Sequence, residues 1–172
     1  MAQRLLFIIN PISGTSRKGK VIKAIERRID AERFSVEIRY TEYAGHAVEI
    51  ARQAAEDGVD IVVAVGGDGT VNEVARSLVH TNTALAIVPS GSGNGLARHL
   101  LIPMDIDKAL DIINANVVTE LDYGLINDKP FFCTCGVGFD AFISLKFAEA
   151  GSRGLKTYLE KTLVDGLRYK PE

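Results

Sequence analysis

Cysteine and histidine are scarce in this sequence of 172 residues, which contains two Cys and three His. The cysteines, Cys133 and Cys135, form a Cys-x-Cys pair inside an apolar run. With so few histidines, such a pair is a poor ligand set for zinc. The alternation predicts that both thiols share one face of a strand, buried and reduced, as in a cytosolic protein.

Long hydrophobic runs are also missing from the N-terminal region. The apolar run Leu5 to Ile9 ends at Asn10-Pro11 and is too short for a signal peptide or a membrane span. Contact with a membrane is therefore expected to be peripheral. A formal net charge of −2 argues against a protein that coats nucleic acid. The length fits one α/β domain with some residues to spare.

Positive charge is nevertheless concentrated in one region, around the first expected helix. Its residues are Arg17, Lys18, Lys20, Lys23, Arg27 and Arg28. Two interpretations stay open. The charges form an ordinary solvated helix face, or they create a positive field near bound phosphates or an anionic membrane surface.

Apolar runs alternate with helical patterns through the first hundred residues. The expected strands are 5–9, 34–40, 60–65 and 84–88, and the expected helices are 20–29, 45–56 and 70–79. This order predicts an α/β fold, a doubly wound and mainly parallel sheet with helices on both faces. Ligands of such folds bind beyond the carboxyl ends of the strands. The loops at 10–14, 66–70 and 89–95 should converge there.

The pattern changes after about residue 120. Residues 120–126 and 131–137, with a turn at 127–130, suggest an antiparallel pair, and 139–147 and 155–167 look helical. We therefore predict an α/β nucleotide-binding domain over residues 1–120. Residues 121–172 are expected to begin a second, antiparallel β-rich and lipid-binding domain, which is truncated in this chain.

The turn Gly66-Gly67-Asp68-Gly69-Thr70 follows a β-branched strand and opens a helix. Its glycines permit close backbone approach, and the helix N-terminus offers unpaired N–H groups to an anion. A phosphate repels a carboxylate, so Asp68 is expected to face a metal ion, a nucleophilic hydroxyl or helix amides. A plain glycine-rich turn with Asp68 as the helix cap is the alternative interpretation.

Two other glycine patterns are near-matches to known motifs. The segment from Gly14 to Lys20 has the spacing of a P-loop, but Val21 stands where that motif needs a Ser or Thr for Mg²⁺. The segment from Gly91 to Gly95 resembles the start of a dinucleotide fingerprint, but Leu96 replaces its third glycine. Neither pattern favours its usual function.

Four motifs occur in an informative order: Asn10 to Gly14, Gly66 to Glu73, Pro89 to Arg98 and Gly136 to Ala141. Together they closely resemble the diacylglycerol kinase catalytic-domain family, which includes bacterial lipid kinases, diacylglycerol kinases and sphingosine kinases. The resemblance covers essentially the whole chain. It implies two domains with ATP in the cleft between them, and Mg²⁺-dependent transfer of the γ-phosphate to the hydroxyl of diacylglycerol or a related lipid.

The resemblance also implies roles for individual residues. Asp68 would be catalytic and would position Mg²⁺ or the acceptor hydroxyl, while the main general base is expected beyond Glu172. Thr41 matches a Thr in the family's adenosine region. The expected ATP-binding residues are Asn10, Pro11, Ile12, Ser13, Gly14, Thr41, Gly66, Gly67, Asp68, Gly69, Thr70, Val71, Asn72, Glu73, Ser92, Gly93 and Asn94.

Several alternatives stay open. Gly95 stands where many diacylglycerol-type relatives carry Asp, so the preferred lipid headgroup is undecided. An NAD kinase would share the Gly-Gly-Asp-Gly-Thr turn, and a non-catalytic nucleotide-binding regulatory module would also fit the sequence. The expected partners are ATP, a lipid, a membrane surface in peripheral contact and a second copy in a homodimer, but no nucleic acid. The expected location is the cytoplasm.

Overall fold

The computed structural model describes residues 2–11 and 18–149 of the chain. The chain divides into two compact units, Met1–Cys133 and Thr134–Glu172. In the second unit the described structure contains helix α6 (Phe139–Glu149), in agreement with the helix predicted over 139–147. The helix predicted over 155–167 lies outside the described residues. The functional division into 1–120 and 121–172 stays a prediction.

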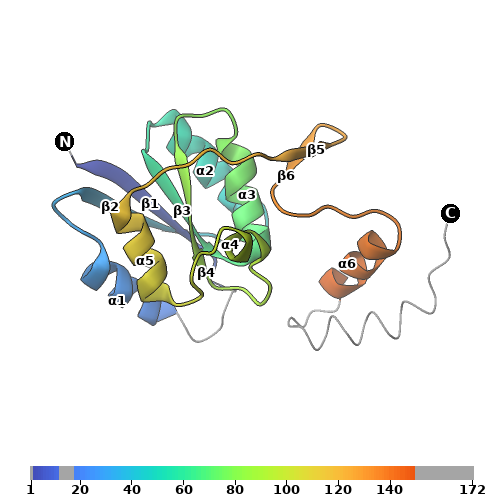
Figure 1. The fold of residues 1–172 in the computed structure, drawn as a ribbon, viewed down its shortest axis with the longest axis horizontal. Coiled ribbons are helices and arrows are strands. Elements are labelled where there is room, and N and C mark those ends of the chain that lie inside the picture. The colour runs from blue at the N-terminus through green and yellow to red at the C-terminus, as the bar shows by residue number, and fades with distance from the viewer. Residues whose placement is uncertain (1, 12–17, 150–172) are drawn as a thin grey trace. The chain divides into compact units, whose positions relative to one another are not determined.

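The first unit is built on a parallel sheet of four strands (Figure 1). These are β1 (Gln3–Ile9), β2 (Phe34–Tyr40), β3 (Ile61–Gly66) and β4 (Ala84–Pro89). Their spatial order is β2-β1-β3-β4, and every pair is parallel. The central strands β1 and β3 are the most continuous apolar runs because helices cover both of their faces. The predicted α/β class is therefore confirmed.

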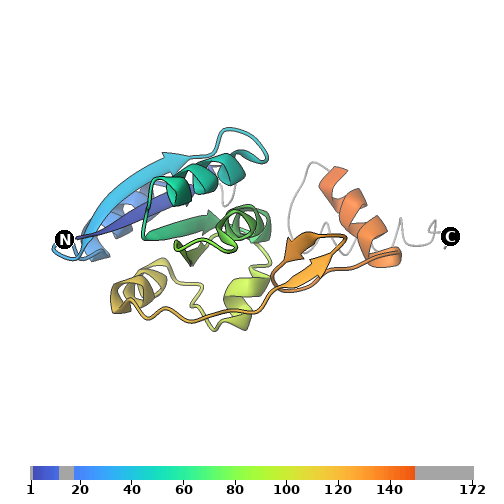
Figure 2. The same ribbon diagram turned by 90° about the horizontal axis from the view of Figure 1, so that it is seen from above.

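Alternating residues of β1 supply the two hydrophobic cores. Leu5, Phe7 and Ile9 are buried in one cluster with apolar residues of α1 (Lys18–Arg28) and α5 (Ile106–Ala115). Leu6 and Ile8 point to the other face, where α2 (His46–Glu56) and α3 (Asp68–Leu78) pack. Figure 2 shows this arrangement from above, with the sheet between the two pairs of helices.

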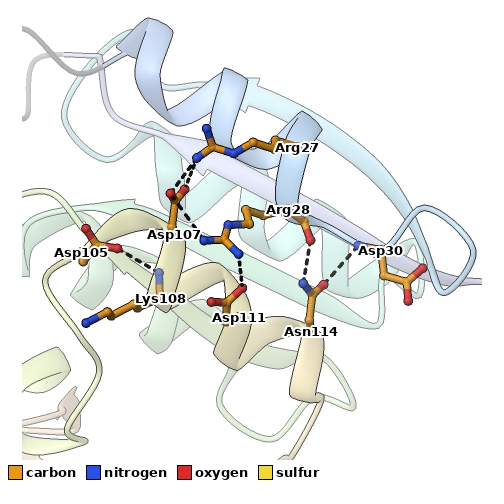
Figure 3. A network of polar contacts seen from close by, with 8 residues as sticks. All are labelled: Arg27, Arg28, Asp30, Asp105, Asp107, Lys108, Asp111 and Asn114. Carbon is orange, nitrogen blue, oxygen red and sulfur yellow. Dashed lines mark hydrogen bonds and ion pairs between the residues drawn. The ribbon is translucent and has the colours of Figure 1, made fainter.

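Helix α5 was not predicted, and polar contacts hold it against α1 (Figure 3). Asp105 caps its N-terminus, since the Asp105 carboxylate accepts the N–H of Lys108 at 3.1 Å. Asp107 accepts two hydrogen bonds from Arg27, at 2.6 and 2.7 Å. Asn114 donates to the carbonyl of Arg28 at 2.7 Å and accepts the N–H of Asp30 at 3.2 Å. These contacts fix the end of α1 and the turn that leads into β2.

The predicted antiparallel pair is present but much shorter than expected. It consists of β5 (Gly124–Ile126) and β6 (Lys129–Phe131). Asn127 and Asp128, with φ of 47° and 61°, form the turn between them. Residues 120–123 form no strand, so the backbone after β6 has no ladder partner there.

That missing partner overturns the prediction for the two cysteines. Cys133 and Cys135 lie beyond the end of β6, and both are exposed rather than buried in a strand. Their sequence alternation therefore does not reflect a pleated strand. Among the described residues no helix combines the length and apolar character needed to cross a membrane.

Candidate functional site

The loops that follow the four strands meet at one edge of the sheet. Neighbouring strand ends are joined there by backbone hydrogen bonds in a row. Thr41 donates to Ile9 at 3.0 Å, Asn10 donates to Val65 at 3.1 Å, and Ser90 donates to Gly66 at 2.8 Å. Because ligands of parallel α/β sheets bind beyond the carboxyl ends of the strands, this edge is the candidate site.

The turn after β3 opens helix α3 with a free helix end. Gly67 stands at the N-cap with extended backbone, and no side chain caps it. The first hydrogen bond of the helix runs from the N–H of Val71 to the carbonyl of Gly67 at 3.0 Å. Among the described residues, no heavy atom outside the local backbone lies within 4 Å of a Cβ atom built at Gly69. Among the described residues no side-chain cap occupies this helix end, and the N–H groups of a first helical turn have no partner within their own helix. Their binding of an anion stays a prediction.

Thr70 faces inward and braces this turn. It is buried, and its Oγ1 accepts a hydrogen bond from Nδ2 of Asn10 at 3.2 Å. A Cβ atom at Gly66 would lie 2.5 Å from the side chain of Thr70, so no larger residue fits there. The loops after β1 and β3 are thus joined through two residues of the predicted site.

Asp68 turns away from its own helix and holds a neighbouring one. Its carboxylate accepts the N–H of Asn94 at 2.9 Å and the N–H of Gly95. Those amides begin the short helix α4 (Gly95–His99). Of the ligands predicted for Asp68, the structure shows helix amides. The amides belong to a different helix, 26 and 27 residues further along the chain.

The close approach of the first turn, Gly66 to Thr70, explains the glycines of a second turn, Gly91 to Gly95, which follows β4. Gly91 and Gly67 approach so closely that a Cβ atom on Gly91 would overlap the Cα atom of Gly67. A Cβ atom on Gly93 would lie 2.6 Å from Oδ2 of Asp68. The resemblance of Gly91 to Gly95 to a dinucleotide fingerprint is therefore incidental, because these glycines accommodate the first turn.

Asn94 shapes the second turn from within. Its backbone is left-handed, with φ of 55°, and its side chain is buried. The side chain accepts the N–H of Gly91 at 2.9 Å and donates to the carbonyl of Gly91 at 2.8 Å. Arg98 adds a bond from Nε to the carbonyl of Gly93 at 2.8 Å. These hydrogen bonds hold the turn in its observed conformation.

The loop between β2 and α2 carries an aromatic pair that the sequence did not predict. Tyr43 stacks on His46 with ring centroids 4.5 Å apart and an angle of 9° between the planes. The Tyr43 hydroxyl donates to Glu49 at 2.9 Å, and this bond raises the pKa of the Tyr43 phenol above its usual value. In the sequence, the Tyr-x-x-His spacing beside a helix start is the feature that could have indicated this stacked pair. His46 is the first residue of α2, one residue later than the helix predicted over 45–56.

The same loop is tied to α3. Glu73 accepts the N–H of Gly45 at 3.1 Å, so a predicted site residue links the loop after β2 to the helix that follows β3. Thr41 is buried at the end of β2, beside this loop. The contact between Glu73 and Gly45 links the loop that carries the Tyr43–His46 pair to the helix that begins at the glycine turn.

The predicted site residues fall into distinct groups in the structure. Asn10, Gly66, Gly67, Asp68, Thr70, Gly93 and Asn94 are joined by the contacts described above. Asn72 and Ser92 are exposed, Pro11 is half-buried, and Val71 is buried in the core beneath α3. Ile12, Ser13 and Gly14 lie outside the described residues.

The carboxylates of the site fit a weakly held magnesium ion rather than a dedicated metal centre. Within residues 2–11 and 18–149 no group of three or more His, Cys, Asp or Glu residues could hold a metal. Mg²⁺ is commonly held by one or two carboxylates together with substrate phosphates. An ionised carboxylate has about four acceptor positions, so Asp68 keeps capacity after its two amide bonds.

Fold and site together define a class of α/β protein in which a helix begins at a glycine-rich turn on the carboxyl edge of a parallel sheet. Comparison with known families narrows this class. Residues 4–126 match the model of the diacylglycerol kinase catalytic domain. The chain therefore belongs to the diacylglycerol kinase catalytic-domain family, as its motifs predicted.

Individual relatives agree with this assignment. A diacylglycerol kinase of Bacillus subtilis is 33% identical over 139 residues, which are 79% of this chain and 46% of the relative. One from Staphylococcus saprophyticus is 32% identical over 133 residues, covering 76% of this chain and 44% of the relative. A crystal structure of a diacylglycerol kinase from Bacillus anthracis superposes with a TM-score of 0.67 and 29% identity, over 75% of this chain and 48% of that one. The chain thus spans about half the length of these relatives.

Proposed function

We propose that this protein binds ATP with Mg²⁺ and acts in an ATP-dependent lipid kinase reaction, in which the γ-phosphate passes to a lipid hydroxyl such as that of diacylglycerol. The observation that carries the proposal is the N-terminus of α3 at Gly67, which no side chain of the described residues caps and where an added Cβ atom at Gly69 would meet none of their atoms. Membership of a family with diacylglycerol kinases supports the choice of reaction.

Phosphoryl transfer requires positioning and charge stabilisation more than covalent chemistry from the protein. In the proposed complex the amides of the Gly66 to Thr70 turn bind phosphate oxygens, because preorganised N–H groups stabilise charge without reorganising. Asn10 holds this turn through its hydrogen bond to Thr70, and Asn94 holds the neighbouring turn through its hydrogen bond with Gly91. Bound Mg²⁺ would supply neutralisation of phosphate charge, with Asp68 as its protein ligand.

The remaining predicted residues complete the proposed ATP site. Thr41 and the Tyr43–His46 pair mark the side on which the adenosine lies, and Glu73 holds this side through Gly45. The backbone of Val71, the side chains of Asn72 and Ser92, and the segment Pro11 to Gly14 are proposed as further contacts. We also propose a cytoplasmic location, peripheral contact with a membrane, and self-association as a homodimer.

Activity measurements on the complete gene product test the proposal. The protein is incubated with γ-labelled ATP and Mg²⁺ and offered vesicles containing diacylglycerol or a sphingoid base, or NAD in solution. We expect label in a lipid. Label in NAD alone would instead identify an NAD kinase. ATP binding without transfer to any acceptor would identify a nucleotide-binding regulatory module.

Asp68→Ala is the informative variant in this assay. We expect it to abolish lipid phosphorylation while the protein stays folded, because the two turns lose both their shared hydrogen bonds and the proposed metal ligand. Asp111→Ala is the matched control, since Asp111 lies on α5 and its ion-pair partner among the described residues is Arg28, at 3.5 Å. Turnover at the wild-type rate in Asp68→Ala would contradict the role given to Asp68.

A further inference from the structure

The outer side of β2 is an unpaired sheet edge. β2 is the first strand in the order β2-β1-β3-β4, and it lies along the outside of the sheet in Figure 2, in light blue. Within the part of the chain that the structure describes, no strand pairs with this side. Seven residues of extended backbone are therefore open to another strand.

The direction of the backbone groups along β2 follows from its pairing with β1. The carbonyl of Arg33 accepts from Gln3 at 2.8 Å, and the N–H of Thr41 donates to Ile9 at 3.0 Å. Hydrogen bonds alternate between the two sides of a strand, so odd-numbered residues bond to β1. The N–H and C=O groups of Val36, Ile38 and Tyr40 consequently point outward.

The side chains of this edge are apolar on one face and charged on the other. Val36 and Tyr40 share a face and are 40% and 46% exposed, so their apolar side chains are accessible to a second strand. Glu37 and Arg39 share the opposite face, where Nε of Arg39 donates to Oε1 of Glu37 at 2.6 Å. Both charged side chains remain substantially exposed.

We propose that β2 pairs antiparallel with β2 of a second copy, about a two-fold axis that passes through Ile38. This interface gives the self-association proposed above a location, and it does not depend on the kinase chemistry. A symmetric pairing of this kind uses one surface twice, so each residue must suit its symmetry-related counterpart.

The charges of β2 select this axis over its neighbours. An axis at Glu37 would place Glu37 opposite its own copy, and an axis at Arg39 would place Arg39 opposite its own copy. The axis at Ile38 instead sets Glu37 opposite Arg39 of the second copy. Opposite charges directly across an antiparallel pair are worth about 0.2–1 kcal/mol, whereas like charges there are destabilising.

The same axis also matches the other groups of the edge. Val36 lies opposite Tyr40 of the second copy, so the exposed apolar side chains cover one another. The outward N–H and C=O groups of Val36, Ile38 and Tyr40 meet outward groups of the second copy, as an antiparallel ladder requires. Apolar contact, charge and hydrogen bonding therefore agree on a single register.

A charge exchange followed by sedimentation equilibrium over a wide concentration series tests this interface. We expect the wild-type protein to dimerise. In Glu37→Arg an Arg faces Arg39 across the axis, and in Arg39→Glu two Glu residues face each other, so each dimer Kd should rise about tenfold or more. The double exchange Glu37→Arg with Arg39→Glu restores both opposite-charge pairs and should return the Kd to within about threefold of wild type.

Glu56→Arg is the matched control, because it makes the same change in net charge at an exposed position near the end of α2. Its dimer Kd should equal that of the wild type. A wild-type protein that stays monomeric throughout the series overturns the proposal. So does a double exchange as weak as the single variants, or a control that weakens the dimer as much as Glu37→Arg does.

Discussion

At the scale of single residues, the contact between the two glycine turns is the most constrained feature of the site. A Cβ atom on Gly91 would meet the backbone of Gly67, whereas one on Gly69 would have no atom of the described residues within 4 Å beyond its local backbone. Both are glycines of the same site, yet the methyl group of an alanine would overlap backbone at Gly91 and would overlap no described atom at Gly69. Their substitution by alanine should therefore have opposite effects on stability.

We expect Gly91→Ala to lower the free energy of unfolding by about 1–3 kcal/mol, since backbone atoms have to separate to admit the new methyl group. Gly69→Ala should leave that free energy unchanged or raise it by up to about 1 kcal/mol, because alanine is favoured over glycine in a helix. Urea unfolding followed by circular dichroism measures both. Equal losses in the two variants would contradict the close approach of Gly67 and Gly91.

At the scale of elements, α5 packs on α1 through shared apolar residues and several polar contacts, among which the amide side chain of Asn114 makes two hydrogen bonds. Asn114 bonds through its side chain to the backbone of both Arg28 and Asp30 (Figure 3). Its own backbone carbonyl accepts from Arg33 at 2.7 Å. The surrounding ion pairs are substantially exposed, and exposed pairs contribute little. Among the polar contacts between the two helices, the Asn114 amide is therefore expected to stabilise the fold more than the exposed ion pairs do.

Asn114→Ala should lower the free energy of unfolding by about 1–2 kcal/mol, because the carbonyl at the end of α1 and the N–H of Asp30 both lose their partner. Lys108→Ala is the control on the same helix, since the Lys108 side chain is exposed, and its effect should stay within about 0.5 kcal/mol. Thermal unfolding of the three proteins compares them. A loss in Lys108→Ala as large as in Asn114→Ala would show that the amide has no special role.

Periodicity allowed most elements of the sheet and its helices to be predicted. The runs at 34–40 and 84–88 reappear in β2 and β4 nearly unchanged, because a strand covered on both faces or on one has a distinct apolar pattern. Helix α5 was missed although Asp105 and the apolar spacing of Ala109, Leu110 and Ile113 would have indicated it. The strand expected at 131–137 was wrong because a strand also needs a partner, which sequence pattern alone does not supply.

The candidate site divides in the same way. Its location at the carboxyl edge follows from the order of strands and helices, which is visible in the sequence. The contact of Asp68 with the amides of Asn94 and Gly95 joins residues 26 and 27 positions apart, so it depends on how β3 and β4 pair. The Tyr43–His46 stack depends on side-chain conformation, so the spacing of the two residues could suggest this contact but could not establish it.

At the scale of the whole first unit, binding at one edge has two separable consequences. Ligand bound to the native state stabilises the unit by RT ln(1 + [L]/Kd), about 2.7 kcal/mol at one hundred times the Kd. This stabilisation slows exchange of every core amide that opens only by global unfolding. Surface loops exchange through local opening instead, so they respond only where the ligand touches them.

Hydrogen exchange with and without ATP and Mg²⁺ should therefore differ between the two ends of the sheet. We expect strong local protection at 66–70, 91–95 and 41–45, the loops at the carboxyl edge. The loops at 57–60 and 80–83 lie at the opposite end of strands about 20 Å long and should exchange as in the free protein. Equal protection of both sets would mean that the nucleotide acts through general stabilisation, whereas protection confined to 57–60 and 80–83 would place the ligand at the wrong edge. Because exchange is read before any transfer of phosphate, the pattern locates the ATP site independently of the lipid that accepts the phosphate.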